Sequence, residues 1–222
     1  MNKKDWIYIG TFVSAVVLAV ILFSINKNPK TEIITDVEDV TATSTEEGLD
    51  GVEVEANAPN EYFDLLSDAR DLTRDKKYNE ALQKTGEAIS LYNGFQAYIT
   101  ISSIHDFTGD IAGKRDALYE VVYTFGNLES KYWRAYLTTL IHSKVDDSMI
   151  RSVYEEGITR IESVASTIGM NHLIDMYTGY ASYLGGNDFY QEAISYLEKA
   201  LAIDPERSDI YNSEIESLQE EL

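Results

Sequence analysis

Acid–base or metal chemistry in this chain would depend on three histidines and the carboxylates, because the sequence has no cysteine. His105, His142 and His172 are far apart, and none has the short spacing to other ligands that metal sites use. The sequence also lacks a nucleophile elbow, a phosphate-binding loop, an HExxH motif and a dinucleotide-binding glycine pattern. We therefore predict no catalytic residue, no metal, no cofactor and no enzymatic activity. No residue spacing favours the alternative, a hydrolase site assembled from a histidine and scattered carboxylates.

Acidic residues occur as adjacent pairs at 146–147, 155–156 and 220–221. Neighbouring side chains on a helix point about 100° apart, so the two members of a pair cannot share one proton as a catalytic dyad does. We interpret these pairs as solvated helix faces or helix caps.

The overall charge limits the partners. The 222 residues include 38 acidic and 18 basic side chains, which give a formal net charge of -20. Such a chain repels phosphate backbones, so we predict no nucleic-acid partner. The absence of cysteine excludes disulfides and lipid anchors attached through sulfur. Nothing in the sequence indicates a small-molecule substrate.

Residues 6–25 read WIYIGTFVSAVVLAVILFSI and carry no charge over 20 positions. A helix needs about 20 apolar residues to cross a bilayer. A buried core helix and a cleaved signal peptide are the alternatives, but this run opens the chain, is longer than a signal peptide's apolar region and lacks a small-x-small exit. We predict an uncleaved transmembrane signal anchor after a short flank at 1–5.

Basic residues flank both ends of this predicted span, with Lys3 and Lys4 before it and Lys27 and Lys30 after it. The short N-terminal flank and the long acidic domain resemble the single-pass anchors of bacterial envelope proteins. We therefore expect a single-pass protein of the cell membrane, with a cytoplasmic N-terminus and an extracytoplasmic domain.

Residues 26–60 separate the predicted anchor from the rest of the chain. The stretch 31–60 contains nine acids, no basic residue and no aromatic residue. This composition is typical of disorder, and like charges keep such a chain extended. We predict an acidic disordered linker here; an acidic docking or cation-binding segment is the alternative, but the spacing of a calcium loop is absent.

From residue 61 to 222 the apolar residues recur at helical spacing. The clearest stripe falls at 78, 81, 82, 85, 88, 89 and 92, which is one face of a helix. A second copy lies 112 residues downstream, and the interval divides into steps of 36, 36 and 40 residues. We predict an all-α solenoid of four helix pairs, with turns near 75–77, 109–110, 145–147 and 185–188. A polar helix over 206–222 would close its end.

Two of these units resemble tetratricopeptide repeats (TPR), whose pattern has small residues in both helices, an aromatic residue that begins the second helix and a closing proline. The residues that carry the resemblance are Ala69, Tyr78, Ala81 and Ala88 in the first unit and Ala181, Tyr190, Ala193, Ala200 and Pro205 in the last. The middle units depart from the pattern, with His105 at the small first-helix position, Lys114 at the aromatic position and Gly157 in a second helix. The resemblance implies a TPR-like α-solenoid and a protein or peptide partner.

We expect the inner surface of this solenoid to recruit or hold a protein at the cell envelope. The candidate contact residues are Arg70, Arg74, Tyr98 and Trp133. Family members that clamp a terminal carboxylate use Lys, Arg and Asn on first helices, and only Arg70 and Arg74 match those positions, so the clamp is not predicted. Core packing is the alternative role for the aromatic residues. The alternative function is a self-associating envelope scaffold without a client.

Overall fold

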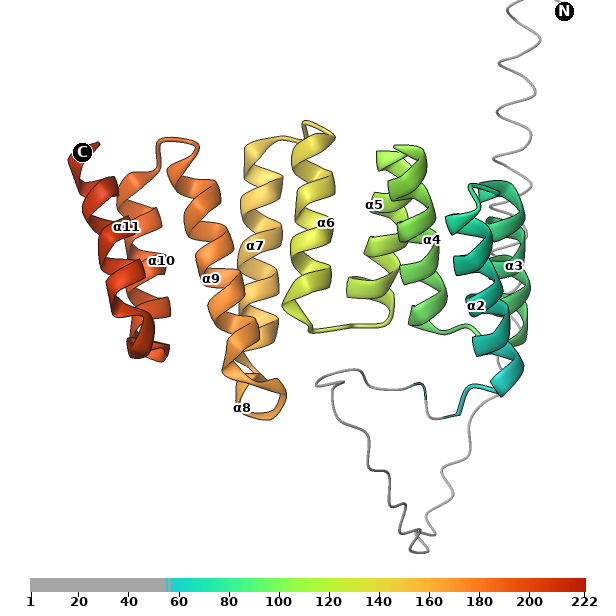
Figure 1. Cartoon of the computed structure of the whole chain (residues 1–222). Helices are drawn as coiled ribbons and strands as arrows, with labels where there is room; N and C mark the ends of the chain where they lie inside the picture. Colours follow the sequence, from blue (N-terminus) through green and yellow to red (C-terminus); the bar gives the residue numbers. More distant parts are fainter. Residues whose placement is uncertain (1–54, 56) are drawn as a thin grey trace, which may run out of the picture. The chain divides into compact units, whose positions relative to one another are not determined.

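The computed structural model describes residues 55 and 57–222 and shows an all-helical domain (Figure 1). The described residues form ten α-helices and no strand. Eight of these helices make four successive pairs: α2 (Asn60–Arg74) with α3 (Tyr78–Leu91), α4 (Phe95–Thr108) with α5 (Ile111–Tyr119), α6 (Ser130–His142) with α7 (Asp147–Glu162), and α9 (Met170–Gly185) with α10 (Tyr190–Ile203). The other two are a short helix α8 (Ala165–Ile168) and the closing helix α11 (Ser208–Glu220). The predicted pairs and closing helix are thus confirmed.

Two irregular segments extend this plan. The π-helical turn η1 (Glu120–Thr124) follows α5 directly, and the 3-10 turn η2 (Pro205–Arg207) leads into α11. Pro205 occupies the first position of η2, where a missing amide hydrogen costs no helical hydrogen bond. The proline therefore separates α10 from α11.

The predicted anchor at 6–25 lies outside the described residues, as does all of 26–54. Of the helices that the structure does describe, none has the length and apolar character needed to cross a membrane.

The end of the predicted linker is different from expectation. Helix α2 begins at Asn60, and Ala58 packs against the apolar cluster of the first pair, so the linker's last residues belong to the folded domain.

The pairs pack in sequence order. Helix α2 contacts both its partner α3 and the next first helix α4, while α6 contacts α7 and α9 (Figure 1). The small residues predicted at the close contacts are buried, as the repeat resemblance implied: Ala69, Ala81, Ala88, Ala181, Ala193 and Ala200. Small side chains let helix axes approach closely, so each pair covers the apolar side of the next.

The middle pairs reach the same packing with other residues. Near the position that corresponds to Ala69, the buried side chain of α4 is Ile104, and the neighbouring His105 is half-buried with Nδ1 3.0 Å from Oδ2 of Asp110. The predicted assignment of His105 to the small position is therefore one residue out of register. Helix α5 likewise begins with Ile111, three residues before Lys114, because α4 ends early at Thr108 and the turn after it has only two residues.

Gly157 departs from the repeat pattern for a steric reason. A Cβ atom at this position would lie 2.7 Å from Cε3 of Trp133 in α6 and 2.9 Å from Cε of Met176 in α9. Both side chains are fully buried. The glycine in the second helix thus makes room for large side chains on the first helices of two successive pairs.

Helix α7 is joined to its neighbours by tyrosine–carboxylate hydrogen bonds. Four tyrosine hydroxyls from η1 and α9 donate to its acidic side chains: Tyr123 to Glu156, Tyr177 to Glu162, Tyr180 to Glu155 and Tyr183 to Asp147. Glu155 and Glu156 point to opposite flanks, as their adjacency predicts. Glu155 is exposed and Glu156 is half-buried, so they lie on a partly solvated face as predicted, and in addition they bridge successive repeats.

Candidate protein-binding face

The two predicted arginines lie on the surface of α2. Arg70 and Arg74 are exposed, and the guanidinium of Arg74 pairs with Asp71 one turn earlier. An ion pair between exposed side chains is worth about 0–1 kcal/mol, so Arg74 can exchange its partner readily. No described contact connects either arginine with Tyr98 or Trp133.

The two predicted aromatic residues are held within the domain. Tyr98 is half-buried in α4, where its ring centroid lies 5.4 Å from that of Phe125 and its hydroxyl donates to Asn93 at 3.2 Å. Trp133 is 0% exposed, and its indole N–H donates to the carbonyl of Asn127 at 3.0 Å. A side chain without exposed surface cannot contact a partner, so the placement of Trp133 corrects its prediction as a groove residue.

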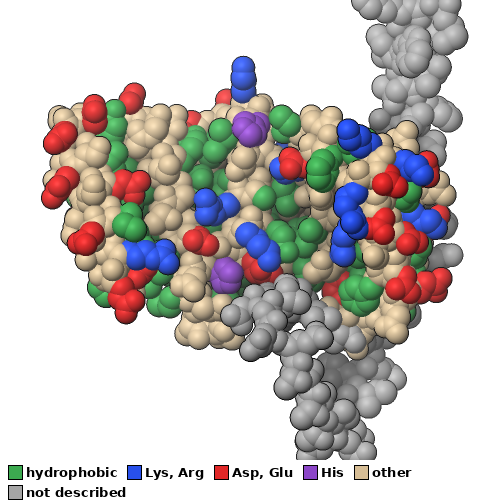
Figure 2. All heavy atoms as spheres, in the orientation of Figure 1, with side chains coloured by type: hydrophobic (Ala, Val, Ile, Leu, Met, Phe, Trp, Pro, Cys, Tyr) green, Lys and Arg blue, Asp and Glu red, His purple; other side chains and the backbone are tan. Residues whose placement is uncertain are grey.

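The acidic residues are unevenly distributed over the first helices. Helix α6 has no acidic residue, and α4 and α9 have one each, Asp106 and Asp175. By contrast, α2 and α11 carry four each. Figure 2 shows that on this side of the domain acidic side chains are denser at both ends than in the middle, where the histidines lie, while Lys and Arg occur both in the middle and among the acids at one end. A chain with a net charge of -20 thus exposes an acid-poor strip.

Helices α6 and α9 form the centre of that strip. We call this surface the α6/α9 face and define it by six exposed or half-buried residues: Lys131, Arg134, Thr138, Thr178, Gly179 and Ser182. Neither Thr178 nor Ser182 was among the predicted contact residues. Lys131, Arg134 and Gly179 were not predicted, because their juxtaposition depends on how α6 docks on α9.

Arg134 and Gly179 lie against each other across the helix contact. A Cβ atom on Gly179 would lie 3.7 Å from Nε of Arg134 and 3.9 Å from Cε1 of Tyr154. Arg134 has no ion-pair partner within the part of the chain that the structure describes. Its guanidinium therefore retains its capacity to bind a carboxylate with two hydrogen bonds.

Lys131 provides a second cation on α6, one turn before Arg134. Its Nζ lies 2.5 Å from Oε2 of Glu129 and 4.7 Å from the ring centroid of Tyr132. Burial raises the pKa of the Tyr132 hydroxyl, so this ring stays neutral at physiological pH. The contacts hold the ammonium group beside an aromatic surface that a partner can also use.

The threonines of the face do not compete for its cations. The hydroxyl of Thr138 donates to the carbonyl of Arg134 at 2.8 Å, and that of Thr178 donates to the carbonyl of Ile174 at 3.0 Å. Both bonds run back along the helix that carries the donor. The threonines consequently offer methyl groups and accepting lone pairs at this surface.

A polar cluster borders the face at the beginning of α6. The Ser130 hydroxyl donates to Asp175 Oδ2 at 2.9 Å and lies 3.1 Å from Nδ1 of His172, which also accepts the Ser130 amide at 3.3 Å. In a nucleophilic triad the imidazole lies between the hydroxyl and the carboxylate. Here the serine lies between them and is buried, so the arrangement docks α9 on the first turn of α6 and does not activate a nucleophile.

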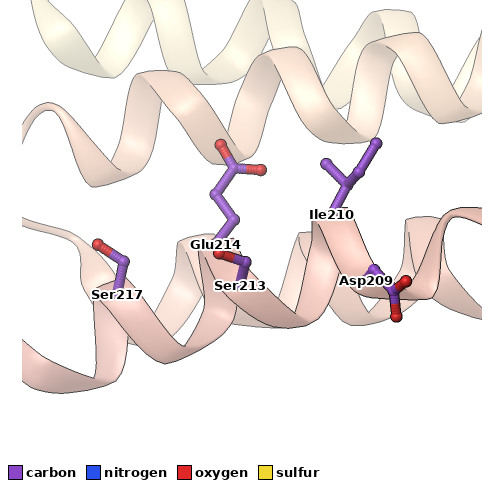
Figure 3. Close-up of a pocket in the computed structure, with 5 residues that line it drawn as sticks. All are labelled: Asp209, Ile210, Ser213, Glu214 and Ser217. Atoms are coloured by element: carbon purple, nitrogen blue, oxygen red, sulfur yellow. The ribbon is translucent and has the colours of Figure 1, made fainter.

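Two hollows lie near the C-terminal end of the domain. One, of about 170 Å3, is bordered by α9, α10 and α11. The other, of about 600 Å3, is wide open and its residues all come from α11: Asp209, Ile210, Ser213, Glu214 and Ser217 (Figure 3). Within residues 55 and 57–222 no group of three His, Asp or Glu side chains could hold a metal ion. Neither hollow gathers residues for catalysis.

No protein-family model matches the chain, and no curated protein matches it. The class of protein is defined by its fold alone, which is an all-helical, repeat-like domain consistent with a TPR-like fold.

Proposed function

We propose that this protein is a membrane-anchored, TPR-like protein-binding module. In this proposal residues 6–25 hold the chain in the cell membrane with the N-terminus in the cytoplasm, and the repeat domain recruits a protein partner at the cell envelope without catalysing a reaction. The buried alanines of the first and last pairs support the TPR-like assignment. A tether supports recruitment, because it raises the local concentration of the module near other membrane proteins.

The observation that carries this proposal is the unpaired Arg134 beside Gly179 in an acid-poor strip. The strip attracts negative charge, whereas both ends of the domain repel it. The missing side chain at 179 lets a peptide backbone or carboxylate approach the guanidinium. The partner is therefore a protein that presents an extended segment with acidic side chains, and Lys131 supplies the second contact.

The test is binding of a fluorescent peptide of alternating Glu and Thr residues to the full chain at physiological salt. Arg134→Glu is expected to weaken binding at least tenfold, because a charge-assisted hydrogen bond is worth about 1.5–3 kcal/mol. Arg70→Glu is the matched control, since Arg70 is also an exposed arginine but lies on α2, and it should change affinity less than twofold. Equal losses for both variants, or no binding by the unmodified chain, would refute the assignment.

A further inference from the structure

Glu55 lies against the N-terminus of α4. Its Oε1 accepts a hydrogen bond from the Gln96 amide at 3.3 Å, although 41 residues separate the two in sequence. Helix α4 begins after Gly94, which provides no side-chain cap of its own. A Cβ atom at Gly94 would lie 2.3 Å from the same Oε1, so the carboxylate occupies the space where any other residue would carry its side chain.

Tyr62 forms the back of this notch. The side chain is 0% exposed, and its hydroxyl accepts the Ala97 amide at 3.1 Å, which leaves the hydroxyl proton free to be donated. Burial and the neighbouring Glu55 carboxylate raise the pKa of Tyr62, so the hydroxyl keeps that proton. The notch thus combines a buried O–H donor, the first amides of a 14-residue helix and the positive end of its dipole.

We infer that Gly94, Gln96 and Tyr62 form a carboxylate-binding site, which the chain fills with its own Glu55. The site caps α4 from outside the helix. It also latches Glu55 onto the second helix pair, although the next helix in the chain, α2, belongs to the first pair. The inference concerns the tether alone and holds whatever partner the α6/α9 face binds.

The second carboxylate oxygen determines how firmly the latch holds. Glu55 Oε2 is buried and has no hydrogen-bond partner in the described part of the chain. An unsatisfied buried oxygen offsets part of the gain from the hydrogen bond that Oε1 accepts. The latch is therefore one that an added carboxylate can replace.

Amide hydrogen exchange of the full chain tests this site, with peptides that cover residues 93–101. Glu55→Ala should speed exchange in this segment at least tenfold, and addition of acetate to that variant should restore the slow exchange. Gly94→Ala, with Glu55 retained, should also speed exchange, but acetate should not restore it because the new methyl group fills the notch. Exchange in α6 serves as the internal reference for intact folding.

Glu61→Ala is the matched control, because Glu61 is an exposed acid in the first turn of α2. It should leave exchange at 93–101 unchanged, also with acetate. If Glu55→Ala leaves the exchange rate of this segment unchanged, the latch is refuted. If the exchange becomes faster but acetate does not slow it, the carboxylate site is refuted. The peptide-binding assay of Arg134→Glu is independent of both results.

Discussion

Gly157 shows how one residue without a side chain fixes the centre of the domain. The ring of Trp133 fills the space beside it and is held in place by the hydrogen bond to Asn127. Met176 closes the same space from α9. We expect Gly157→Ala to lower the free energy of unfolding by about 1–3 kcal/mol, because overpacking outweighs the helix propensity that alanine adds. Urea denaturation of the full chain measures this change.

Gly86 provides the matched control for that substitution. It also lies within a second helix, α3, but a Cβ atom there would meet nothing within 4 Å. Gly86→Ala should therefore stabilise the protein by about 0.5–1 kcal/mol, the difference in helix propensity. A Gly157→Ala variant as stable as the unmodified chain would contradict the close packing around Trp133.

Sequence reasoning succeeded at the residues whose spacing repeats and failed at the residues whose environment is made by another helix. Ala81 and Ala193 were predicted at close helix contacts because they share a register, and both are fully buried. Trp133 was predicted in a groove because aromatic side chains are good contact anchors, with core packing as the alternative, and its burial bears out that alternative. Its burial depends on Gly157, 24 residues later in the chain.

At the scale of the helix, α7 also shows that an environment made by another helix is not predictable from the sequence of the helix itself. The adjacent acids at 146–147 and 155–156 were interpreted as solvated faces or caps, but the hydrogen bonds that the four acids of α7 accept from tyrosine hydroxyls of η1 and α9 were not predicted. The available signal was the spacing of Tyr177, Tyr180 and Tyr183, which places three hydroxyls along one side of α9. That spacing does not identify the acceptors, because these belong to the preceding helix pair.

These bonds make the stability of the domain sensitive to alkaline pH. Burial and then the hydrogen bond to Asp147 raise the pKa of Tyr183 to about 12. Burial followed by a carboxylate bond raises the pKa of Tyr123 and Tyr177 as well. Above about pH 10 an unfolded tyrosine loses its proton while the folded one keeps it, so the folded state loses stability as pH rises.

We therefore expect the free energy of unfolding to be unaffected by tyrosine ionisation at pH 8–9 and to fall steadily from pH 10 to pH 12. Urea denaturation at each pH gives this profile. Tyr183→Phe removes one titrating hydroxyl and should make the fall less steep, with no change in its onset. A flat profile above pH 10 would show that these hydroxyls titrate equally in the folded and unfolded chain.

At the scale of the whole domain, the order of the pairs was predictable but the binding face was not. The 112-residue register located the first and last pairs. The partnership of Arg134 with Gly179 did not follow, because the step from α6 to α9 is 40 residues and includes the short helix α8. Where the step between repeats is irregular, the sequence does not show which side chains become neighbours, because the packing of the helices decides it.

The closing helix α11 limits the stack at one end. It buries Tyr211 and Ile215 and lies beside α10. Its outer side carries the exposed Asp209, Ser213, Glu214 and Ser217 beside one exposed apolar side chain, Ile210, so a further repeat would find mostly polar residues there. This polarity weighs against end-to-end association of the intact protein through this end, as a solenoid cap does.

Removal of residues 205–222 should abolish that protection. The side chains of Tyr211 and Ile215 each contribute about 1.5–3 kcal/mol of burial, so we expect unfolding to require about 3–6 kcal/mol less. The newly exposed side of α10 should also drive concentration-dependent association, measured by light scattering after size-exclusion chromatography. Removal of 221–222 alone is the control, since both residues are exposed. If the longer truncation keeps the association state and stability of the intact chain, α11 is an appendage and the domain ends with α10.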